Sequence, residues 1–212
     1  MSIEEETLVT GATGLVGSCI RAKHRLSSQN DLREKDVAES LFCQLSPRYV
    51  VHCAAKVGGL GANMSKKGEF FYDNIMMNTN VLEAARKAGV EKLVAFLSTC
   101  VFPDVVEYPL DATKIHQGEP HVSNYPYAYA KRMLDVQIRA YREQYEVNYT
   151  SVIPTNIYGP RDNFSVTDGH VIPALIHKCY LARERGTAFE VWGTGSPLRE
   201  FIYSEDVGQI TE

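Results

Sequence analysis

The chain has 212 residues, of which 44% are hydrophobic, and its formal net charge is −4. This length suffices for one sizeable α/β core, or for one domain and part of another. The acidic balance excludes a protein that binds nucleic acid or an anionic membrane through a strongly basic surface.

The sequence gives no sign of export, a membrane span or a metal centre. No apolar run approaches the roughly 20 residues that cross a bilayer. The N-terminus MSIEEET is acidic where a signal peptide is basic. The five cysteines form no CxxC pair and no metal-ligand spacing. We therefore expect reduced thiols and a cytoplasmic protein without a metal.

Strand-like and helix-like segments alternate along the sequence. In chain order they are a strand at 7–11, the start of a helix at 15–23, a helix at 31–45, a strand at 49–55, a helix at 70–89, a strand at 92–98, a helix at 127–145, a strand at 149–159, a helix at 171–185 and a short strand at 189–193. This alternation predicts an α/β fold, in which helices cover both faces of a doubly wound parallel sheet.

The segment VTGATGLVG, residues 9–17, follows the first strand and opens a helix. Gly11, Gly14 and Gly17 let the backbone turn tightly and approach a pyrophosphate, which rests on the amide-rich N-terminus of the helix. A tight structural turn is the alternative interpretation. Directly after a first strand, the motif predicts a Rossmann-type dinucleotide-binding domain. Its GxxGxxG spacing resembles that of the extended branch of the short-chain dehydrogenase/reductase superfamily.

Three residues further along the chain suit the chemistry of a reductase. Tyr127 and Lys131 are four residues apart on a predicted helix, so both side chains can reach one site. A fixed ammonium lowers the pKa of a tyrosine from about 10 toward working pH. Tyr129 points away and is expected to pack, and Tyr125 precedes the helix. Ser98 falls at the carboxyl end of a strand, and by resemblance to the superfamily it hydrogen-bonds the substrate carbonyl.

Further motifs occur in the same order as in one family. They are AAKVGG (54–59), STCVFP (98–103), PTNIYGPRDNF (154–164), DGHVIPAL (168–175) and VWGTGSPLREF (191–201). Together they resemble the GDP-L-fucose synthase family, and the resemblance extends from about Thr7 to Val207. Members of that family are 3,5-epimerases and 4-reductases that convert GDP-4-keto-6-deoxy-mannose to GDP-L-fucose with NADPH.

The resemblance implies a role for Cys100, which lies two residues after Ser98. A 4-keto group acidifies the C–H bonds at C3 and C5, and inverting these centres needs a base and an acid on opposite faces of the ring. A thiolate and a histidine suit the task because both can titrate close to neutral pH. The family implies that Cys100 is the base and His170 the acid, while Ser98 and Tyr127 hold the 4-oxygen. The alternative for Cys100 is a buried packing residue.

The resemblance also implies which residues bind NADP(H) and the GDP-sugar. The implied cofactor residues are Gly11, Ala12, Thr13, Gly14, Leu15, Val16, Gly17, Asp31, Leu32, Ala54, Ala55, Phe96, Leu97, Ser98, Thr99, Tyr127, Lys131, Pro154, Thr155, Asn156, Ile157 and His170. The implied substrate residues are Lys178, Trp192 and Arg199. An arginine suits a diphosphate because its guanidinium makes paired hydrogen bonds; the family often has arginine where Lys178 stands. Packing and ordinary surface charge are the alternatives for Trp192 and Arg199.

One departure from the family lies between Ile20 and Asp31. Ten residues stand there, where the end of a helix, a turn and a strand of about 5 residues are usual, so we expect that about a dozen residues are missing. The region normally contacts the adenosine 2′-phosphate, for which Arg21 and Arg25 are candidates. Asp31 and Leu32 resemble the adenine contact of the superfamily, although Asp31 is an equally good helix N-cap.

We expect an NADP-binding Rossmann domain at 1–165 and the start of a substrate-binding region at 166–212, which is truncated relative to the family. The helices around 74–88 and 127–145 form the dimer interface in this superfamily, so a homodimer is expected; their apolar residues can instead face the sheet. One alternative function is a nucleotide-sugar 4-epimerase or 4,6-dehydratase, which would not need Cys100 with His170. Another is a truncated isoform that binds nucleotide without turnover.

Overall fold

The computed structural model describes residues 2–196 and 198–212. Within these ranges a five-stranded sheet has the order β2-β1-β3-β4-β5, and all neighbouring strands are parallel. From β1 the chain moves to β2 on one side and then returns to the other side for β3. This reversal confirms the predicted doubly wound sheet, and it places a ligand crevice at the carboxyl end of β1. The strands are β1 (Thr7–Thr10), β2 (His24–Leu26), β3 (Tyr49–His52), β4 (Lys92–Phe96) and β5 (Asn148–Val152).

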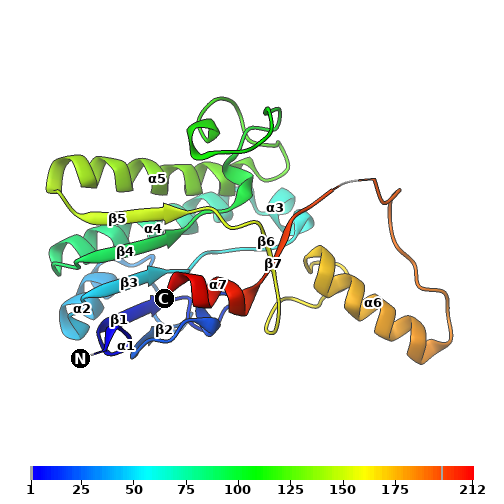
Figure 1. The fold of residues 1–212 in the computed structure, drawn as a ribbon, viewed down its shortest axis with the longest axis horizontal. Coiled ribbons are helices and arrows are strands. Elements are labelled where there is room, and N and C mark those ends of the chain that lie inside the picture. Colours follow the sequence, from blue (N-terminus) through cyan, green and yellow to red (C-terminus); the bar gives the residue numbers. More distant parts are fainter. Residues whose placement is uncertain (1, 197) are drawn as a thin grey trace.

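Three helices cover one face of this sheet (Figure 1): α2 (Lys35–Leu45), α4 (Lys67–Lys87) and α5 (Tyr125–Tyr145). Successive residues of a strand point to opposite faces. Leu8 of β1 and Val50 of β3 therefore pack together with buried side chains of these helices. Apolar contact with the sheet, more than local propensity, holds helices of this kind in place.

The opposite face carries a smaller core around α7 (Ser204–Thr211). Val9 of β1 and Val51 of β3 point to this side, where Val207 of α7 packs with them. Gly208 allows α7 to come close, because a Cβ there would lie 2.5 Å from the carbonyl oxygen of Cys19. Thus α7 packs on the sheet although it lies beyond residue 165, and the division into 1–165 and 166–212 stays a prediction.

The remaining elements are short or lie beside the main sheet. Strand β6 (Asn156–Tyr158) pairs in parallel with β7 (Phe201–Tyr203), and α6 (Val171–Arg185) extends away from the five-stranded sheet in Figure 1. The others are α1 (Ile3–Glu6), α3 (Leu60–Ser65) and the 3-10 helices η1 (Gly17–Cys19), η2 (Thr99–Val101) and η3 (Ala112–Lys114). None of the described helices combines the length and apolar character needed to cross a membrane.

The predicted first helix is wrong. In place of a helix starting at 15–23, the chain forms η1 and then enters β2. The second strand is therefore present within the ten residues that precede Asp31, because a three-residue turn replaces most of the helix. The helix predicted at 171–185 is confirmed as α6, and Gly186 ends it with a φ of 62°.

Two predicted strands also differ from the structure. The segment 149–159 forms β5 and β6, which belong to different sheets. Pro154 lies between them, and proline has no N–H with which to continue a ladder. The described residues 189–193 form no strand, and Gly193 there has a φ of 89°. The partner of β6 is β7, which the sequence did not predict.

Candidate active site

The turn after β4 places Ser98 beside Cys100. Ser98 is extended and caps η2, where its Oγ accepts a hydrogen bond from the backbone N–H of Cys100 at 3.5 Å. Serine is favoured at such a position because its side chain satisfies an amide that the short helix leaves unpaired. The hydroxyl of Ser98 and the thiol of Cys100 therefore lie together at the carboxyl end of β4.

Helix α5 brings Tyr127 and Lys131 to the same strand end. The ammonium of Lys131 is buried, donates to the carbonyl oxygen of Phe96 at 2.7 Å, and lies 5.9 Å from the centre of the Tyr127 ring. The helix begins at Tyr125, two residues earlier than predicted, and Pro126 occupies its first turn. Proline suits this turn because its missing N–H would have no partner within the helix.

Burial shifts the pKa values of Tyr127, Lys131 and Cys100. It raises the pKa of Tyr127, and a charge on Cys100 would raise it further. This is opposite to the predicted direction, because the effect of burial on the phenol dominates. Burial lowers the pKa of Lys131 to about 8. It also raises the pKa of Cys100, which Ser98 and Lys131 partly offset. The contacts of Ser98 with Cys100, and of Lys131 with Phe96 and the Tyr127 ring, place these side chains at the same strand end.

A cavity of about 200 Å³ opens beside Cys100. Thr99, His121 and Asn124 contribute to its wall. The Oδ1 atom of Asn124 is buried and lacks a hydrogen-bond partner among the described residues, so it can accept from a hydroxyl group. The sequence reasoning missed His121 and Asn124. Their position in the polar loop just before Tyr127 was the available signal.

His170 comes from a different segment of the chain, between β6 and α6. It is the N-cap of α6, and its Nδ1 atom is 3.1 Å from a carboxylate oxygen of Asp162. The hydrogen bond with Asp162 raises the pKa of His170, because it favours the imidazolium. In the described part of the chain, His170 contacts neither Cys100 nor the cavity beside it. An acid and a base on opposite faces of a sugar ring need no direct contact with each other, so the role of His170 stays a prediction.

The segment that carries His170 nevertheless lies against the loop after β3. A Cβ at Gly59 would be 2.7 Å from the carbonyl oxygen of Asp168. Glycine is needed at this contact, since a side chain would push the two loops apart. The contact links the segment of His170 to the loop that contains Ala54 and Ala55, two residues predicted to bind the cofactor.

The glycine-rich loop occupies the crevice predicted for the cofactor. Gly11 has a φ of 66°, and a Cβ there would lie 2.8 Å from backbone atoms of Ala54. A Cβ at Gly17 would lie 2.4 Å from the carbonyl oxygen of Gly11. The loop therefore fits a dinucleotide whose phosphates approach the backbone. The following helix is the three-residue η1, so the helix N-terminus predicted for the pyrophosphate is much reduced.

Both arginines proposed for the adenosine 2′-phosphate have other partners. Arg21 is exposed and forms an ion pair with Glu212. The guanidinium of Arg25 closes the shortened connection between β1 and β2, where it replaces contacts that a longer helix would make. It donates at 2.6 to 2.9 Å to the carbonyl oxygens of Ala12, Gly17 and Ile20.

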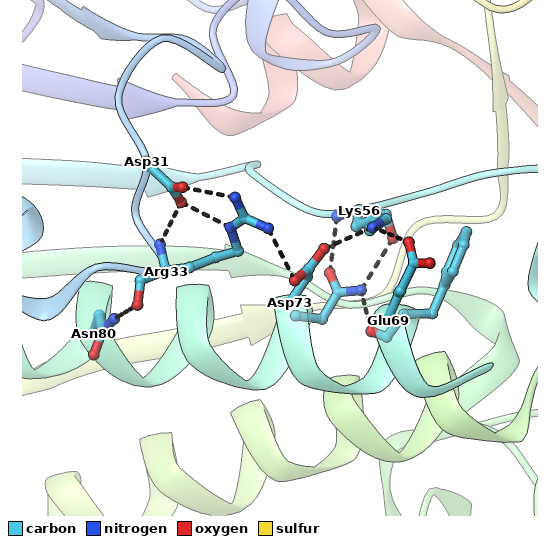
Figure 2. A network of polar contacts seen from close by, with 8 residues as sticks. Asp31, Arg33, Lys56, Glu69, Asp73 and Asn80 are labelled. Carbon is cyan, nitrogen blue, oxygen red and sulfur yellow. Dashed lines mark hydrogen bonds and ion pairs between the residues drawn. The ribbon is translucent and has the colours of Figure 1, made fainter. Parts of the chain in front are cut away.

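Asp31 belongs to a polar network, and the N-cap interpretation is wrong. Helix α2 begins at Lys35 with Glu34 as its N-cap. Figure 2 shows that the carboxylate of Asp31 instead accepts two hydrogen bonds from the guanidinium of Arg33, at 2.7 and 2.8 Å. Arg33 holds the pKa of Asp31 at about 2, since these bonds favour the carboxylate. Leu32 points the other way and is buried in the core.

The same network fastens two loops to α4. Arg33 also donates to Asp73 at 3.1 Å, and Asp73 accepts from Lys56 at 2.7 Å. Lys56 reaches Glu69 at 2.8 Å (Figure 2). The loop after β2 and the loop after β3 are thus held at one edge of α4, on the side where the adenine was predicted to bind.

The residues predicted to bind the sugar nucleotide are only partly gathered. The ammonium of Lys178 on α6 lies 3.3 Å from the centre of the Trp192 ring, a cation–π contact. Arg199 is exposed and donates to the carbonyl oxygen of Leu198; among the described residues it contacts neither of them. Pro154 and Thr155 lie between β5 and β6, and Asn156 and Ile157 open β6.

Residues 20–211 match the NAD dependent epimerase/dehydratase family, and the chain belongs to that family. It is 51% identical to the GDP-L-fucose synthase of Dictyostelium discoideum, over 95% of this chain and 67% of that protein. It is 42% identical to a probable GDP-L-fucose synthase of Drosophila melanogaster, over 97% of this chain and 70% of that protein.

The fold is also shared with solved structures. A GDP-L-fucose synthetase from Naegleria fowleri bound to NADP is 46% identical and superposes with a TM-score of 0.91 over 100% of this chain and 72% of that chain. The chain spans about two thirds of the length of the curated relatives it matches. The family resemblance and the Rossmann-type fold predicted from the motifs are confirmed.

Proposed function

We propose that this protein is an NADPH-dependent GDP-L-fucose synthase, which converts GDP-4-keto-6-deoxy-mannose to GDP-L-fucose by epimerisation at C3 and C5 and reduction at C4. The observation that carries the proposal is the gathering of Ser98, Cys100, Tyr127 and Lys131 at the carboxyl end of β4. A nucleotide-sugar 4-epimerase or dehydratase would use the serine, tyrosine and lysine but has no need of the neighbouring thiol. The names of the relatives support the substrate, and the NADP in the Naegleria structure supports the cofactor.

Reduction needs a proton for the 4-oxygen. NADPH, when bound, supplies the hydride that C4 receives. Tyr127 gives the proton, because its raised pKa keeps the phenol protonated at neutral pH. Ser98 donates a second hydrogen bond to the same oxygen as negative charge develops there. Lys131, fixed by the Phe96 carbonyl, favours the tyrosinate that remains after the transfer.

Epimerisation needs a base on one face of the ring and an acid on the other. Cys100 takes the protons from C3 and C5, and the hydrogen bonds of Ser98 and Tyr127 to the 4-oxygen stabilise the enolate. Burial favours the thiol form of Cys100, and the hydrogen bond with Ser98 and the charge of Lys131 partly offset this and aid formation of the thiolate. Asp162 favours the protonated form of His170, which would return protons to C3 and C5 from the opposite face of the ring.

The cofactor would lie across the crevice at the carboxyl end of β1. Gly11 to Gly17 would hold its phosphates, and Ala54 and Ala55 the adjoining ribose. The residues 96–99 and 154–157 would border the nicotinamide, and His170 would approach it from the substrate side. The Arg33 network would support the adenine end through Asp31.

We also infer a cytoplasmic homodimer. On α5, Leu134 and Ile138 face the sheet, but Met133 is 41% exposed and Val136 is 38% exposed. Phe71 of α4 is exposed as well. These side chains form an apolar surface that a second copy can cover. Met133→Glu should convert the dimer to a monomer in sedimentation analysis, whereas a parent protein that sediments as a monomer would contradict the inference.

The proposed function is tested by incubating the protein with NADPH and GDP-4-keto-6-deoxy-mannose. Loss of absorbance at the NADPH band with formation of GDP-L-fucose supports it. Reduction that yields unepimerised GDP-6-deoxy sugars would indicate a reductase without epimerase activity. Nucleotide binding without turnover would indicate a binding protein, and an interconversion that consumes no NADPH would indicate a 4-epimerase.

A further inference from the structure

Three buried polar side chains lie beneath the glycine-rich loop and take no part in the chemistry proposed above. Thr10 ends β1, His52 ends β3 and Asn78 lies on α4. Thr10 and His52 are 0% exposed, and Asn78 is 1% exposed. Groups of this kind are unfavourable in a core unless each finds a hydrogen-bond partner. Their sequence positions, each next to an apolar run, gave no indication that they meet.

Four hydrogen bonds connect these side chains in a row. At one end, the backbone N–H of Ala54 donates to Thr10 Oγ1 at 3.1 Å. Thr10 Oγ1 lies 2.7 Å from His52 Nδ1, and His52 Nε2 lies 3.0 Å from Asn78 Oδ1. At the other end, Asn78 Nδ2 donates to the carbonyl oxygen of Ala130 at 3.5 Å, the longest of the four. Ala54 packs on the glycine-rich loop, and Ala130 precedes Lys131.

The end of the row at Ala130 sets the direction of its hydrogen bonds, and the end at Ala54 is compatible with that direction. A backbone N–H can only donate, so Thr10 Oγ1 accepts from Ala54 and its own proton is available for His52 Nδ1. A backbone carbonyl can only accept, so Asn78 must turn its amide nitrogen to Ala130 and its oxygen to His52. His52 Nδ1 is then an acceptor and Nε2 a donor. The contact of Asn78 with Ala130 therefore assigns the tautomer of the neutral ring, and the contact of Thr10 with Ala54 is compatible with it.

We propose that His52 is a positioning residue, held as the neutral Nε2–H tautomer, that fixes the glycine-rich loop relative to the helix of Tyr127 and Lys131. One side of its ring is tied through Thr10 to the place where the cofactor phosphates would bind. The other side is tied through Asn78 to the backbone next to the catalytic lysine. The distance between cofactor and proton donor therefore depends on this row. Only its effect on the reaction rests on the proposed function.

The surroundings of His52 favour the neutral ring. Thr10 on β1 and Asn78 on α4 are uncharged, and Lys131 on α5 is the charged group close enough to act on it. Burial and then the charge of Lys131 lower the pKa of His52 to about 4. Burial raises the pKa of the neighbouring Cys53 to about 12, so that thiol supplies no counter-charge at neutral pH. An imidazolium would reverse the bond with Thr10 and oppose the ammonium of Lys131.

The tautomer is tested on the protein itself, without substrate or cofactor. Two-bond proton–nitrogen NMR spectra of protein labelled with ¹⁵N-histidine distinguish a protonated ring nitrogen from an unprotonated one. The His52 signals, assigned by their loss in His52→Gln, should show a protonated Nε2 and a bare Nδ1 from pH 8 down to about pH 5.5. His116 and His121, whose rings are exposed, serve as controls for the spectra. A protonated Nδ1, or a His52 ring that titrates near pH 6.5, overturns the proposal.

The effect on the reaction is tested with a matched pair at Thr10. Thr10→Ser keeps the hydroxyl, whereas Thr10→Val keeps the shape and removes it. Thr10→Val and Asn78→Leu should each lower kcat about tenfold with little change in KM for the sugar, and Thr10→Ser should restore the parental kcat. The double variant should be no worse than the poorer single variant, because both changes interrupt one row. A Thr10→Val protein with lowered Tm and parental kcat would reduce the row to a structural role.

The two proposals can fail separately. A parent protein without turnover contradicts the proposed function, while the NMR experiment still decides the tautomer of His52. If Thr10→Val does not fold, the NMR result on the parent protein and the kinetics of Thr10→Ser and Asn78→Leu decide the inference.

Discussion

At the scale of single residues, neighbouring tyrosines on α5 have different surroundings. Tyr127 shares its site with Cys100 and Lys131. Tyr129 instead packs edge-on against Tyr125, with ring centres 6.4 Å apart. Tyr127→Phe should therefore lower the rate of NADPH-dependent reduction by about 10²–10⁴, the usual loss of a general acid, and leave NADPH affinity unchanged. Tyr129→Phe is the control; equal losses in the two variants would show that the wrong tyrosine was assigned.

Cys100 permits a test that separates the two reactions. Cys100→Ser keeps the size of the side chain but removes its acidity, since a thiol has a pKa near 8.5 and an alcohol is far harder to ionise. We expect reduction to continue and to give unepimerised GDP-6-deoxy sugars. Solvent deuterium should enter C3 and C5 with the parent protein and not with the variant, as mass spectrometry of the product will show. GDP-L-fucose formed by the variant at the parental rate would make Cys100 a packing residue.

The pH dependence of that exchange follows from the protonation of Cys100. Burial raises the pKa of the thiol, and only the thiolate can remove a proton. The rate of deuterium entry should therefore rise with pH above neutrality and continue to rise beyond the pH at which an ordinary thiol is half ionised. Rates are measured from the initial mass increase of the sugar. An exchange rate that is already constant at pH 7 would contradict a buried thiol as the base.

Some of the site could be predicted from local spacing, and some could not. Helix periodicity predicts that Tyr127 and Lys131 share one face of a helix. A single buried apolar run predicts the strand that ends before Ser98. Both patterns can be recognised in short stretches of sequence. The contact of His170 with Asp162 depends on how the loop before α6 folds, which helix or strand periodicity does not reveal. Arg25 donates to three backbone carbonyls because the connection between β1 and β2 is short. The assignment of Arg25 to the adenosine 2′-phosphate assumed the longer connection that is usual in the family.

At the scale of elements, a shared carboxylate holds α4 against α5. Glu83 of α4 accepts from Arg86 at 2.7 Å and from the hydroxyl of Tyr141 on α5 at 2.8 Å. The hydrogen bond from Arg86, opposed by burial and helped by Tyr141, lowers the pKa of Glu83 to about 2. Because the pKa is lower in the folded state than the usual 4.3 or so, the carboxylate stabilises the fold above that value and the gain disappears as pH falls toward 2.

Glu83→Gln should consequently lower the free energy of unfolding at pH 7 by about 1–2 kcal/mol. The difference between parent and variant should shrink between pH 5 and pH 2, as urea unfolding at each pH will show. Glu39→Gln is the control, because its partners Lys35 and Lys87 are exposed and such pairs contribute little. A difference that is constant with pH would mean that the charge of Glu83 is not what stabilises the helix pair.

Elements with a clear pattern of apolar residues were predictable, whereas their boundaries depended on the tertiary structure. Helix α6 was predicted to the residue because its periodic segment ends at Gly186, the residue type that a left-handed terminus favours. The first helix was predicted from the glycine motif and is absent from the described residues. In its place Arg25 satisfies carbonyl groups of the turn, a long-range substitution that no local propensity can indicate.

At the scale of the whole molecule, the doubly wound parallel sheet could be predicted from the alternation of strands and helices, but the segment that completes its second core could not. The sheet needs a cover on each face, and α2, α4 and α5 supply one. On the other face α7 contributes Val207 from near the end of the chain, beside the reduced helix η1. The cofactor loop therefore lies between η1 and the loop after β3, with little helix behind it, so nucleotide binding and folding should be closely linked.

NADPH should raise the Tm of the protein, because a ligand that binds only the folded state stabilises it. At a concentration of 100 times Kd the gain is about 2.7 kcal/mol, which corresponds to roughly 5–10 °C for a protein of this size. NADH should raise the Tm less.

Gly17→Ala should abolish the shift in Tm with NADPH, since its Cβ would lie 2.4 Å from the Gly11 carbonyl oxygen and displace the loop. Gly68→Ala, where a Cβ meets nothing within 4 Å, should keep it. The measurement is differential scanning fluorimetry of each variant with and without nucleotide. An NADPH shift that survives Gly17→Ala would place the nucleotide elsewhere, and no shift in the parent would mean that the shortened connection after β1 has lost the binding site.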